Sequence, residues 1–324
     1  MNKSTRVAFC TLIISIIVLA LKTKAYYATL SVAVLSDALE TVVNVITATV
    51  ALYAVKAAAE PADENHPYGH GKFEYFSAAF EGGLIFFAAL AIVFQAVQSL
   101  IGQHVLQNAT EGNLYIVVAT AINLGTSLFL LNFGKAQKSE ALKASGKHIL
   151  TDVGTSIAVI LGLYLVKWTG IQWIDSAVAL ALGFWLMYEA YDILRTNSGA
   201  LLDEADAGAL AQLAEVINKN KNPAVIDIHN LRMIRSGNFH HIDAHMVVPE
   251  FWDVAHVHSV THEFEKNVVR DYHYDGELAF HIDPCKRAFC KQCNVETCTI
   301  RKLNFESVRI MDAEHLVKGP QYTN

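Results

Sequence analysis

Six long apolar stretches in the first two thirds of the chain constrain its fold more than any other feature. A helix needs roughly 20 mainly apolar residues to cross the hydrocarbon core of a bilayer, and each stretch reaches or approaches that length. None of the six prolines lies inside a stretch, so uninterrupted helices are expected. The sequence therefore predicts a membrane α-helical domain. Its spans are residues 6–26, 29–55, 76–101, 112–134, 145–166 and 173–194.

The chain beyond the last span has a different composition. It is rich in His, Asp, Glu and Lys, although the mean hydropathy of the whole 324-residue chain is +0.29. We therefore predict two domains, 1–204 in the membrane and 205–324 in water. In the second, helical and strand periods alternate, which indicates an α+β domain. Its predicted elements are a helix at 205–220, strands at 224–234 and 239–248, a helix at 253–270 and a strand at 277–283.

The Lys/Arg distribution predicts the orientation, because short cytoplasmic loops retain these residues. Placing both termini in the cytoplasm puts nine inside and three outside; a five- or seven-span topology would put the C-terminus outside. Lys22 and Lys24 follow the first apolar run where a signal peptide would carry small residues, so a mature first helix is expected. The short loops and the lack of targeting extensions suggest a bacterial inner membrane. The nine are Lys3, Arg6, Lys56, Lys72, Lys135, Lys138, Lys143, Lys147 and Arg195, and the three are Lys22, Lys24 and Lys167.

Polar side chains stand out inside two of the spans. An ionisable group at the membrane centre costs roughly 2.5–3.5 kcal/mol on insertion scales, so it needs a reason. Glu40 and Asn44 are four residues apart in the second span, as are His148 and Asp152 in the fifth. Each pair projects from one helix face, about 6 Å apart along the axis. Facing one another, the pairs would form a cage for a divalent transition metal. The alternative is a set of hydrogen bonds between helices, and Asp37 fits such a packing role.

A loop follows the second span and concentrates further ligand types. Asp63, His66 and His70 lie within eight residues, in a stretch that Gly and Pro make rich in turns. Oxygen and imidazole ligands suit a second divalent ion at the mouth of the bundle. The alternative is that this loop only shapes the connection and its histidines are solvated.

Four of the five cysteines fall within fourteen residues near the C-terminus. Cys285, Cys290, Cys293 and Cys298 have the spacing C-x4-C-x2-C-x4-C. In a reducing cytoplasm this favours metal ligation over a structural disulfide, and four thiolates close a tetrahedral zinc site. The alternative is a set of reduced, unligated thiols. The formal charge of −6, with no basic stripe, argues against a nucleic-acid partner.

Three motifs in this order around six spans resemble the cation diffusion facilitator family. They are the HPYGHGK run at residues 66–72, the His148/Asp152 pair and the HIDPC run at residues 281–285. The resemblance covers almost the whole chain. It implies a proton-coupled exporter of divalent metal ions that works as a homodimer in the lipid membrane. It also implies a ferredoxin-like, metallochaperone-like fold for the C-terminal domain.

The resemblance also implies a role for individual residues. The transport site falls on Glu40, Asn44, His148 and Asp152, where Glu and Asn depart from the Asp/Asp or His/Asp of familiar members. The loop site falls on Asp63, His66 and His70. A cytoplasmic binuclear site falls on His229, His245, His258, His281 and Asp283, and a salt bridge that holds the dimer together pairs Lys72 with Asp203. Five further histidines of the tail are expected to be solvated: His240, His241, His256, His262 and His273.

The expected function is therefore proton-coupled efflux of Zn, Fe, Co, Mn or Cd by alternating access, with zinc first among them. The unperturbed pKa of an imidazole lies near neutrality, so protons and metal would compete at His148. An alternative is a membrane-anchored metal sensor that does not transport. An enzyme is not expected, because no His-Glu-x-x-His helix or nucleophile motif is present.

Overall fold

The structure, a computed structural model, describes residues 3–102, 109–137, 140–223 and 225–319. It divides into two compact units. The first comprises Met1–Lys56 and Phe76–Ser198, and the second comprises Ala57–Tyr75 and Gly199–Asn324. The loop after the second helix thus belongs with the C-terminal unit. The predicted boundary at residue 204 stays a proposal for where the membrane domain ends.

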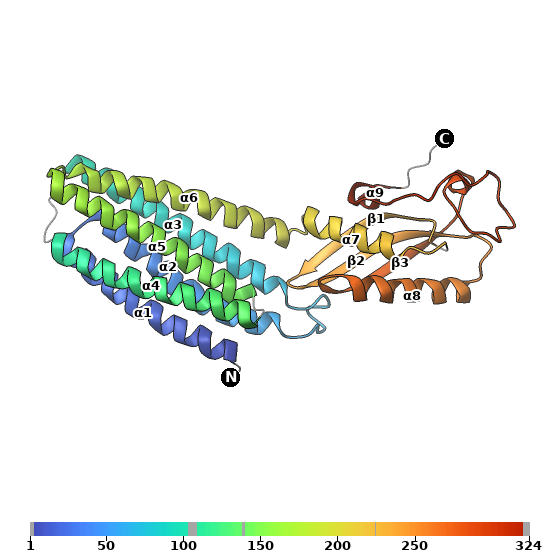
Figure 1. Cartoon of the computed structure of the whole chain (residues 1–324), viewed down its shortest axis with the longest axis horizontal. Coiled ribbons are helices and arrows are strands. Elements are labelled where there is room, and N and C mark those ends of the chain that lie inside the picture. Colours follow the sequence, from blue (N-terminus) through green and yellow to red (C-terminus); the bar gives the residue numbers. More distant parts are fainter. Residues whose placement is uncertain (1–2, 103–108, 138–139, 224, 320–324) are drawn as a thin grey trace. The chain divides into compact units, whose positions relative to one another are not determined.

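Six helices among the described residues are long and apolar enough to cross a membrane (Figure 1). They confirm the six predicted spans, each to within about five residues at its ends except the last, which was predicted to end at residue 194 and continues to Leu201. Lys138, counted above for the orientation, lies outside the described residues. The helices are α1 Lys3–Thr29, α2 Val32–Ala58, α3 Lys72–Gly102, α4 Ala109–Gln137, α5 Glu140–Thr169 and α6 Trp173–Leu201.

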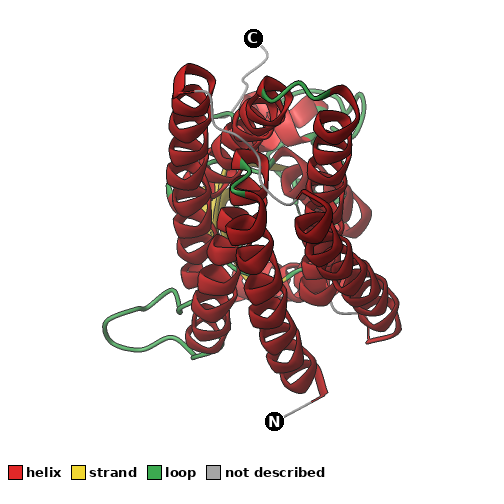
Figure 2. Ribbon diagram, turned by 90° about the vertical axis from the view of Figure 1, so that its left-hand side faces the viewer, coloured by secondary structure: helices red, strands yellow, loops and turns green. Residues whose placement is uncertain are grey.

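The long helices lie side by side as a bundle (Figure 2), with small residues at some of the closest helix contacts and many large apolar residues exposed on the outside. Ala89 and Ala190 are fully buried where α3 meets α6, and a Cβ on Gly183 would lie 2.8 Å from the Val93 side chain. Phe87, by contrast, is 70% exposed. Lipid tails are as apolar as these side chains, so helices in a membrane associate by close packing of small residues. This distribution therefore fits a bundle surrounded by lipid.

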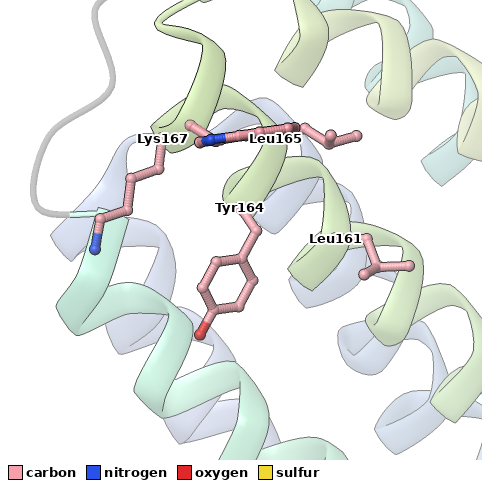
Figure 3. Close-up of a pocket in the computed structure, with 5 residues that line it drawn as sticks. Leu161, Tyr164, Leu165 and Lys167 are labelled. Carbon is pink, nitrogen blue, oxygen red and sulfur yellow. The ribbon is translucent and has the colours of Figure 1, made fainter.

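A hollow on the outer face of α5 is also lined mainly by large apolar side chains (Figure 3). It has a volume of about 500 Å³ and is lined by Leu161, Tyr164, Leu165, Lys167 and Trp168, all from one helix. Aromatic rings beside a lysine near a helix end are typical of the interface between lipid and water. Its lining holds no carboxylate, imidazole or thiol, so it is not a metal site.

The second unit contains a three-stranded sheet with the order β1-β2-β3. β1 and β2 are antiparallel, and β2 and β3 are parallel. The α-β-β-α-β sequence of elements confirms the prediction and is the ferredoxin-like order without its first strand. Residue 224, where the first strand was predicted to begin, lies outside the described residues. The elements are α7 Ala207–Asn220, β1 Asp227–Ser236, β2 Phe239–Val248, α8 Val254–Asp271, β3 Asp275–Pro284, the 3-10 helix η1 Arg287–Lys291 and α9 Ala313–Val317.

The core of this unit lies between the sheet and helices α7 and α8. Met246 and Ile228 from the strands pack with Leu213 and Phe264 from the helices, and all four are almost fully buried. Side chains alternate between the two faces of a strand. The residues next to these core positions therefore point to the opposite face of the sheet. That face carries four of the five histidines of the strands.

Candidate metal centres

The polar side chains of α2 and α5 meet inside the bundle. Asn44 Nδ2 donates a hydrogen bond to Asp152 Oδ2 at 2.7 Å, and His148 Nε2 lies 3.2 Å from Asn44 Oδ1. Glu40 Oε2 accepts a hydrogen bond from Thr155 Oγ1 at 3.2 Å. The four side chains predicted from the i,i+4 spacing thus come from two facing helices, with three of them in direct contact. The geometry is that of an oxygen and imidazole site within the apolar spans.

One carboxylate oxygen of this group has no partner. Asp152 is 4% exposed, and its Oδ1 atom makes no hydrogen bond within the described part of the chain. An unpaired polar atom costs free energy in a buried site, and such atoms in proteins usually have a ligand, a water molecule or a function. The orphan oxygen lies in the same side chain that contacts Asn44, next to the imidazole of His148. The site therefore offers a buried acceptor oxygen without a protein partner among the described residues.

A buried ion pair lies on the same helix face as Glu40. Lys22 Nζ donates to Asp37 Oδ1 at 2.8 Å, and Ser156 Oγ donates to the same oxygen at 2.7 Å. Lys22 and Asp37 are 0% and 1% exposed. Lys22, counted above on the outer side, is thus buried within the bundle, because α1 continues to Thr29 and the lysine pairs with Asp37. The signal was present in the sequence, since a charged residue on each of two adjacent spans suggests a pair.

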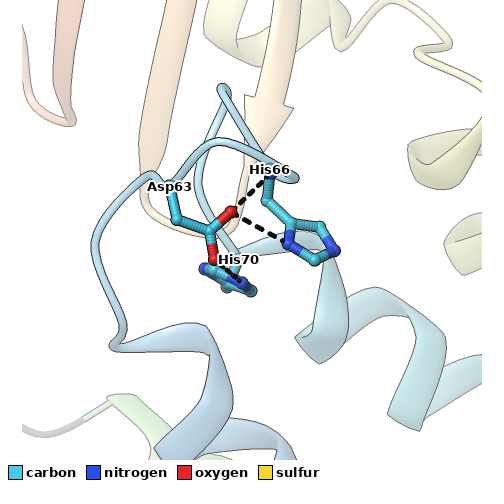
Figure 4. Close-up of side chains that lie close together, drawn as sticks. All are labelled: Asp63, His66 and His70. Carbon is cyan, nitrogen blue, oxygen red and sulfur yellow. Dashed lines mark hydrogen bonds and ion pairs between the residues drawn. The ribbon is translucent and has the colours of Figure 1, made fainter.

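The loop between α2 and α3 gathers Asp63, His66 and His70 so that one ligand atom of each lies within 4.8 Å of the others (Figure 4). His66 N donates to Asp63 Oδ1 at 2.6 Å, and His70 Nε2 lies 3.5 Å from Asp63 Oδ2. The backbone N–H of His66 is the main reason that the pKa of Asp63 is lowered, so its carboxylate is ionised. His70 Nδ1 lies 3.2 Å from the carbonyl oxygen of Pro61, a contact that orients the ring.

A second cluster of possible metal ligands lies on the sheet face away from α7 and α8. His229 and His245 pair across β1 and β2, and His245 pairs with His281 on β3. His245 Nδ1 lies 2.9 Å from Asp283 Oδ2, and His229 Nε2 lies 3.5 Å from the same oxygen. One ligand atom each of His229, His245 and Asp283 lies within 4.8 Å of the others. Strand register thus aligns three histidines and one carboxylate in a row across the sheet.

His281 and His258 occupy different places relative to this set. His281 Nε2 lies 3.8 Å from Asp283 Oδ1, and its side chain is 69% exposed, so it stands at the edge of the set. His258 belongs to α8, whose core residue Phe264 packs on the other face of the sheet, and its ring stacks on His262. The structure does not bring His258 into the set within one chain.

Sequence reasoning missed the residue behind His229. Asp227 is fully buried, and its Oδ2 lies 3.3 Å from His229 Nδ1 while its Oδ1 lies 2.8 Å from His315 Nε2 of α9. A carboxylate behind an imidazole fixes the orientation of the ring. Burial lowers the pKa of His229, so the ring is neutral at neutral pH and has a lone pair for a metal. The signal was the Asp-x-His spacing, which puts both residues on one face of a strand.

The other tail histidines are not all solvated. His240 is 2% exposed; its Nδ1 lies 2.9 Å from Tyr272 Oη, and its ring stacks on Tyr274. Its expected solvation is therefore wrong, because its position in β2 points into the unit. His241 is half-buried, with its Nδ1 2.8 Å from Glu277 Oε1. The three others are exposed as expected: His256, His262 and His273.

The four clustered cysteines are free thiols that line one cavity of about 260 Å³. All four are described by the structure, and no three of their sulfur atoms lie within 4.8 Å of one another. Burial raises the pKa of the Cys285 thiol. The cysteines are Cys285, Cys290, Cys293 and Cys298.

The predicted salt bridge between Lys72 and Asp203 is present. Lys72 Nζ lies 2.8 Å from Asp203 Oδ1, with side chains 35% and 39% exposed. An exposed pair of this kind stabilises by under about 1 kcal/mol. Its predicted contribution to a dimer stays a prediction.

Six apolar helices with a polar site inside them and imidazole–carboxylate clusters outside define an integral membrane protein built to handle cations. A family model described as the cation efflux transmembrane domain matches residues 8–202, and a second, the cation efflux protein cytoplasmic domain, matches residues 206–285. The chain therefore belongs to the cation diffusion facilitator family of transporters, as the resemblance implied.

Curated relatives agree with this assignment. The chain is 35% identical to an uncharacterized transporter of Synechocystis over 82% of its own length and 86% of the relative. It is 31% identical to an uncharacterized transporter of Methanocaldococcus jannaschii, over 71% and 81% of the two chains. It is also similar to the cation-efflux pump FieF of Cronobacter sakazakii, at 25% identity over 87% and 93%.

Proposed function

We propose that this protein exports a divalent transition-metal ion from the cytoplasm in exchange for protons, with zinc as the first candidate among Zn, Fe, Co, Mn and Cd. The observation that carries the proposal is the unpaired, buried Asp152 Oδ1 beside His148 and Asn44. One imidazole with carboxylate and amide oxygens suits a divalent ion of this group better than Cu(I), which prefers sulfur.

The ligand types explain how protons take part. A metal ion binds a neutral imidazole and an ionised carboxylate, so it competes with protons at His148, Glu40 and Asp152. Asn44 cannot titrate, and its amide supplies an oxygen without a charge. A protein that alternates between two orientations of this site would release metal where protons are abundant and bind it where they are scarce.

The remaining assignments follow from the same proposal. Both termini lie in the cytoplasm of a bacterium, in its inner membrane, and the working form is a homodimer whose C-terminal units associate. The clusters around Asp63 and His229 bind further ions on the cytoplasmic side and report the metal level to the bundle. A matched domain described as cytoplasmic and named for dimers supports both assignments.

The test is metal flux into proteoliposomes that contain the purified chain, with and without an imposed pH gradient. We expect zinc flux that the gradient accelerates, because protons empty the site on one side. Asp152→Ala removes the orphan oxygen and is expected to abolish flux. Thr151→Ala, an exposed neighbour on the same helix, is the matched control and is expected to retain it.

Three results would contradict the proposal. Flux that ignores the gradient would remove proton exchange. Absence of flux in the unaltered chain, with metal still bound by the C-terminal unit, would favour the membrane-anchored sensor. Flux that survives Asp152→Ala would move the transport site elsewhere in the bundle.

A further inference from the structure

The segment that follows β3 is irregular but packed. Between Cys285 and Asp312, a stretch that the structure describes in full, the only regular element is the five-residue η1. Phe289, Cys293 and Val295 of this segment form a small buried cluster with Val247 of β2 and Ile226 before β1. So few apolar side chains rarely hold a segment of this length, and small cores are usually reinforced by a disulfide or a metal. The family match ends at residue 285, so it assigns no role to this segment.

One arginine holds the backbone around two of the cysteines. The guanidinium of Arg301 donates to the carbonyl oxygens of Cys290 at 3.3 Å, Cys293 at 3.0 Å and Val295 at 2.7 Å. Three hydrogen bonds from one planar group fix the loop that joins the two cysteines. The C-x2-C turn is therefore built before any ligand arrives.

All four cysteines of the segment line one cavity, and most of the charged residues around it are cationic. Cationic side chains of Lys286, Arg287, Arg301 and Lys302 line the same cavity, against the single carboxylate of Glu250. The backbone N–H of Lys302 lies 3.5 Å from Cys290 Sγ, and the N–H of Glu250 hydrogen-bonds to Cys285. Nearby cations and N–H donors favour bound thiolates, whereas burial, the largest influence on Cys285, raises the pKa of its thiol.

We propose that Cys285, Cys290, Cys293 and Cys298 bind one thiophilic divalent cation, Zn²⁺ in the cell and Cd²⁺ as its laboratory analogue. The site is distinct from the transport site and from the two imidazole–carboxylate clusters. Four thiols lose four protons to the solvent, and the tetrathiolate with its ion carries a net charge of −2, which the cationic rim offsets. The ion fastens residues 285–312 to the sheet that carries His229 and His245.

Binding requires the loop to close. Sulfur ligands about 2.3 Å from a zinc ion lie about 3.8 Å from one another in a tetrahedron. No three of the four described sulfur atoms lie within 4.8 Å of one another, so the sulfurs must come closer together when the ion binds. A disulfide would join only two of the four cysteines and would need an oxidant. The arrangement around one cavity thus fits an ion better than a bridge.

The test uses the full chain in detergent, under reducing conditions, with the other candidate sites removed by Asp152→Ala, His66→Ala and His229→Ala. Cd²⁺ is added, and absorption from sulfur-to-cadmium charge transfer is recorded together with the metal content after gel filtration. We expect one Cd²⁺ per chain with that absorption. Because no transport is measured, failure here is distinguishable from failure of the proposed function.

Cysteine variants in the same background localise the ion. Cys298→Ser, at a half-buried position, is expected to lose the absorption and the bound ion while the circular dichroism of the chain is unchanged. Cys293→Ser is the second variant, because its burial makes misfolding a risk that circular dichroism detects. Cys10→Ser, in α1 and exposed, is the matched control and is expected to retain the ion.

Three outcomes would overturn the proposal. The first is the absence of charge-transfer absorption in a folded chain. The second is full Cd²⁺ binding after both Cys298→Ser and Cys293→Ser. The third is mass spectrometry that finds two of the four cysteines joined as a disulfide in chains purified without reductant, with no metal bound.

Discussion

The two units of the molecule assemble their polar clusters by opposite means. In the helix bundle, polar residues on one helix meet residues on another, as Lys22 meets Asp37, while several buried polar atoms, among them Asp152 Oδ1 and Asp37 Oδ2, have no partner within the described residues. In the C-terminal unit, His229, His245 and His281 lie side by side because strand register puts them there. The comparison teaches that a bundle builds a site by helix–helix packing, whereas a sheet builds one by pairing.

The largest effect is expected from breaking the buried ion pair in the bundle. Lys22→Met leaves the Asp37 carboxylate buried without its counter-ion, which costs about 3–5 kcal/mol for pairs of this kind. Thermal unfolding of the detergent-solubilised chain measures the loss. Lys24→Met, an exposed lysine on the same helix, is the control and should change stability by under about 0.5 kcal/mol. Equal losses in the two variants would mean that the pair contributes nothing.

The next effect is expected on the sheet. His229→Ala removes one imidazole from the set on β1, β2 and β3. Loss of a residue that only hydrogen-bonds to a metal ligand lowers metal affinity by about 10- to 100-fold, and we expect a larger fall here because a ligand itself is lost. Calorimetric titration with Zn²⁺ of the Asp152→Ala chain measures it. His273→Ala, an exposed histidine outside the set, should leave the titration unchanged. An unaltered titration for His229→Ala would show that the aligned residues on the three strands do not bind the metal ion.

A smaller effect is expected where the loop between α2 and α3 packs on the turn between β1 and β2. A Cβ on Gly71 would lie 2.1 Å from the backbone oxygen of Ser236, so Gly71→Ala must displace one backbone from the other. We expect a loss of about 1–3 kcal/mol in the stability of this unit, as for other overpacked positions. Gly83→Ala is the control, because nothing lies within 4 Å of the added carbon. Hydrogen exchange of residues 57–75 would locate the change.

The smallest effect is a dependence of stability on pH through His240. Burial lowers the pKa of this imidazole, so the folded state keeps it neutral while the unfolded chain takes up a proton. Stability is therefore complete above about pH 6.5, the ordinary value, and declines as the pH falls below it. Thermal unfolding between pH 7.5 and pH 5.5, compared with His240→Gln, measures the difference. A slope that survives in the variant would belong to another group.

The sequence by itself determined the elements and the local spacings. Six spans followed from apolar length alone, because the bilayer sets one physical minimum for every helix that crosses it. The order of elements in the C-terminal unit followed from a change of hydrophobic period. The pairs Glu40/Asn44 and His148/Asp152 followed from helical geometry, which fixes the face that residues four apart share.

Only the tertiary structure decided which groups meet. Periodicity within an element carries no information about its partner, so the burial of Lys22 against Asp37, the Asp227 carboxylate behind His229 and the burial of His240 all escaped prediction. The same holds for the absence of His258 from the set on the sheet, since α8 covers the other face. Long-range packing chooses partners, and its choices rest on the shape and charge of surfaces that the linear chain does not place side by side.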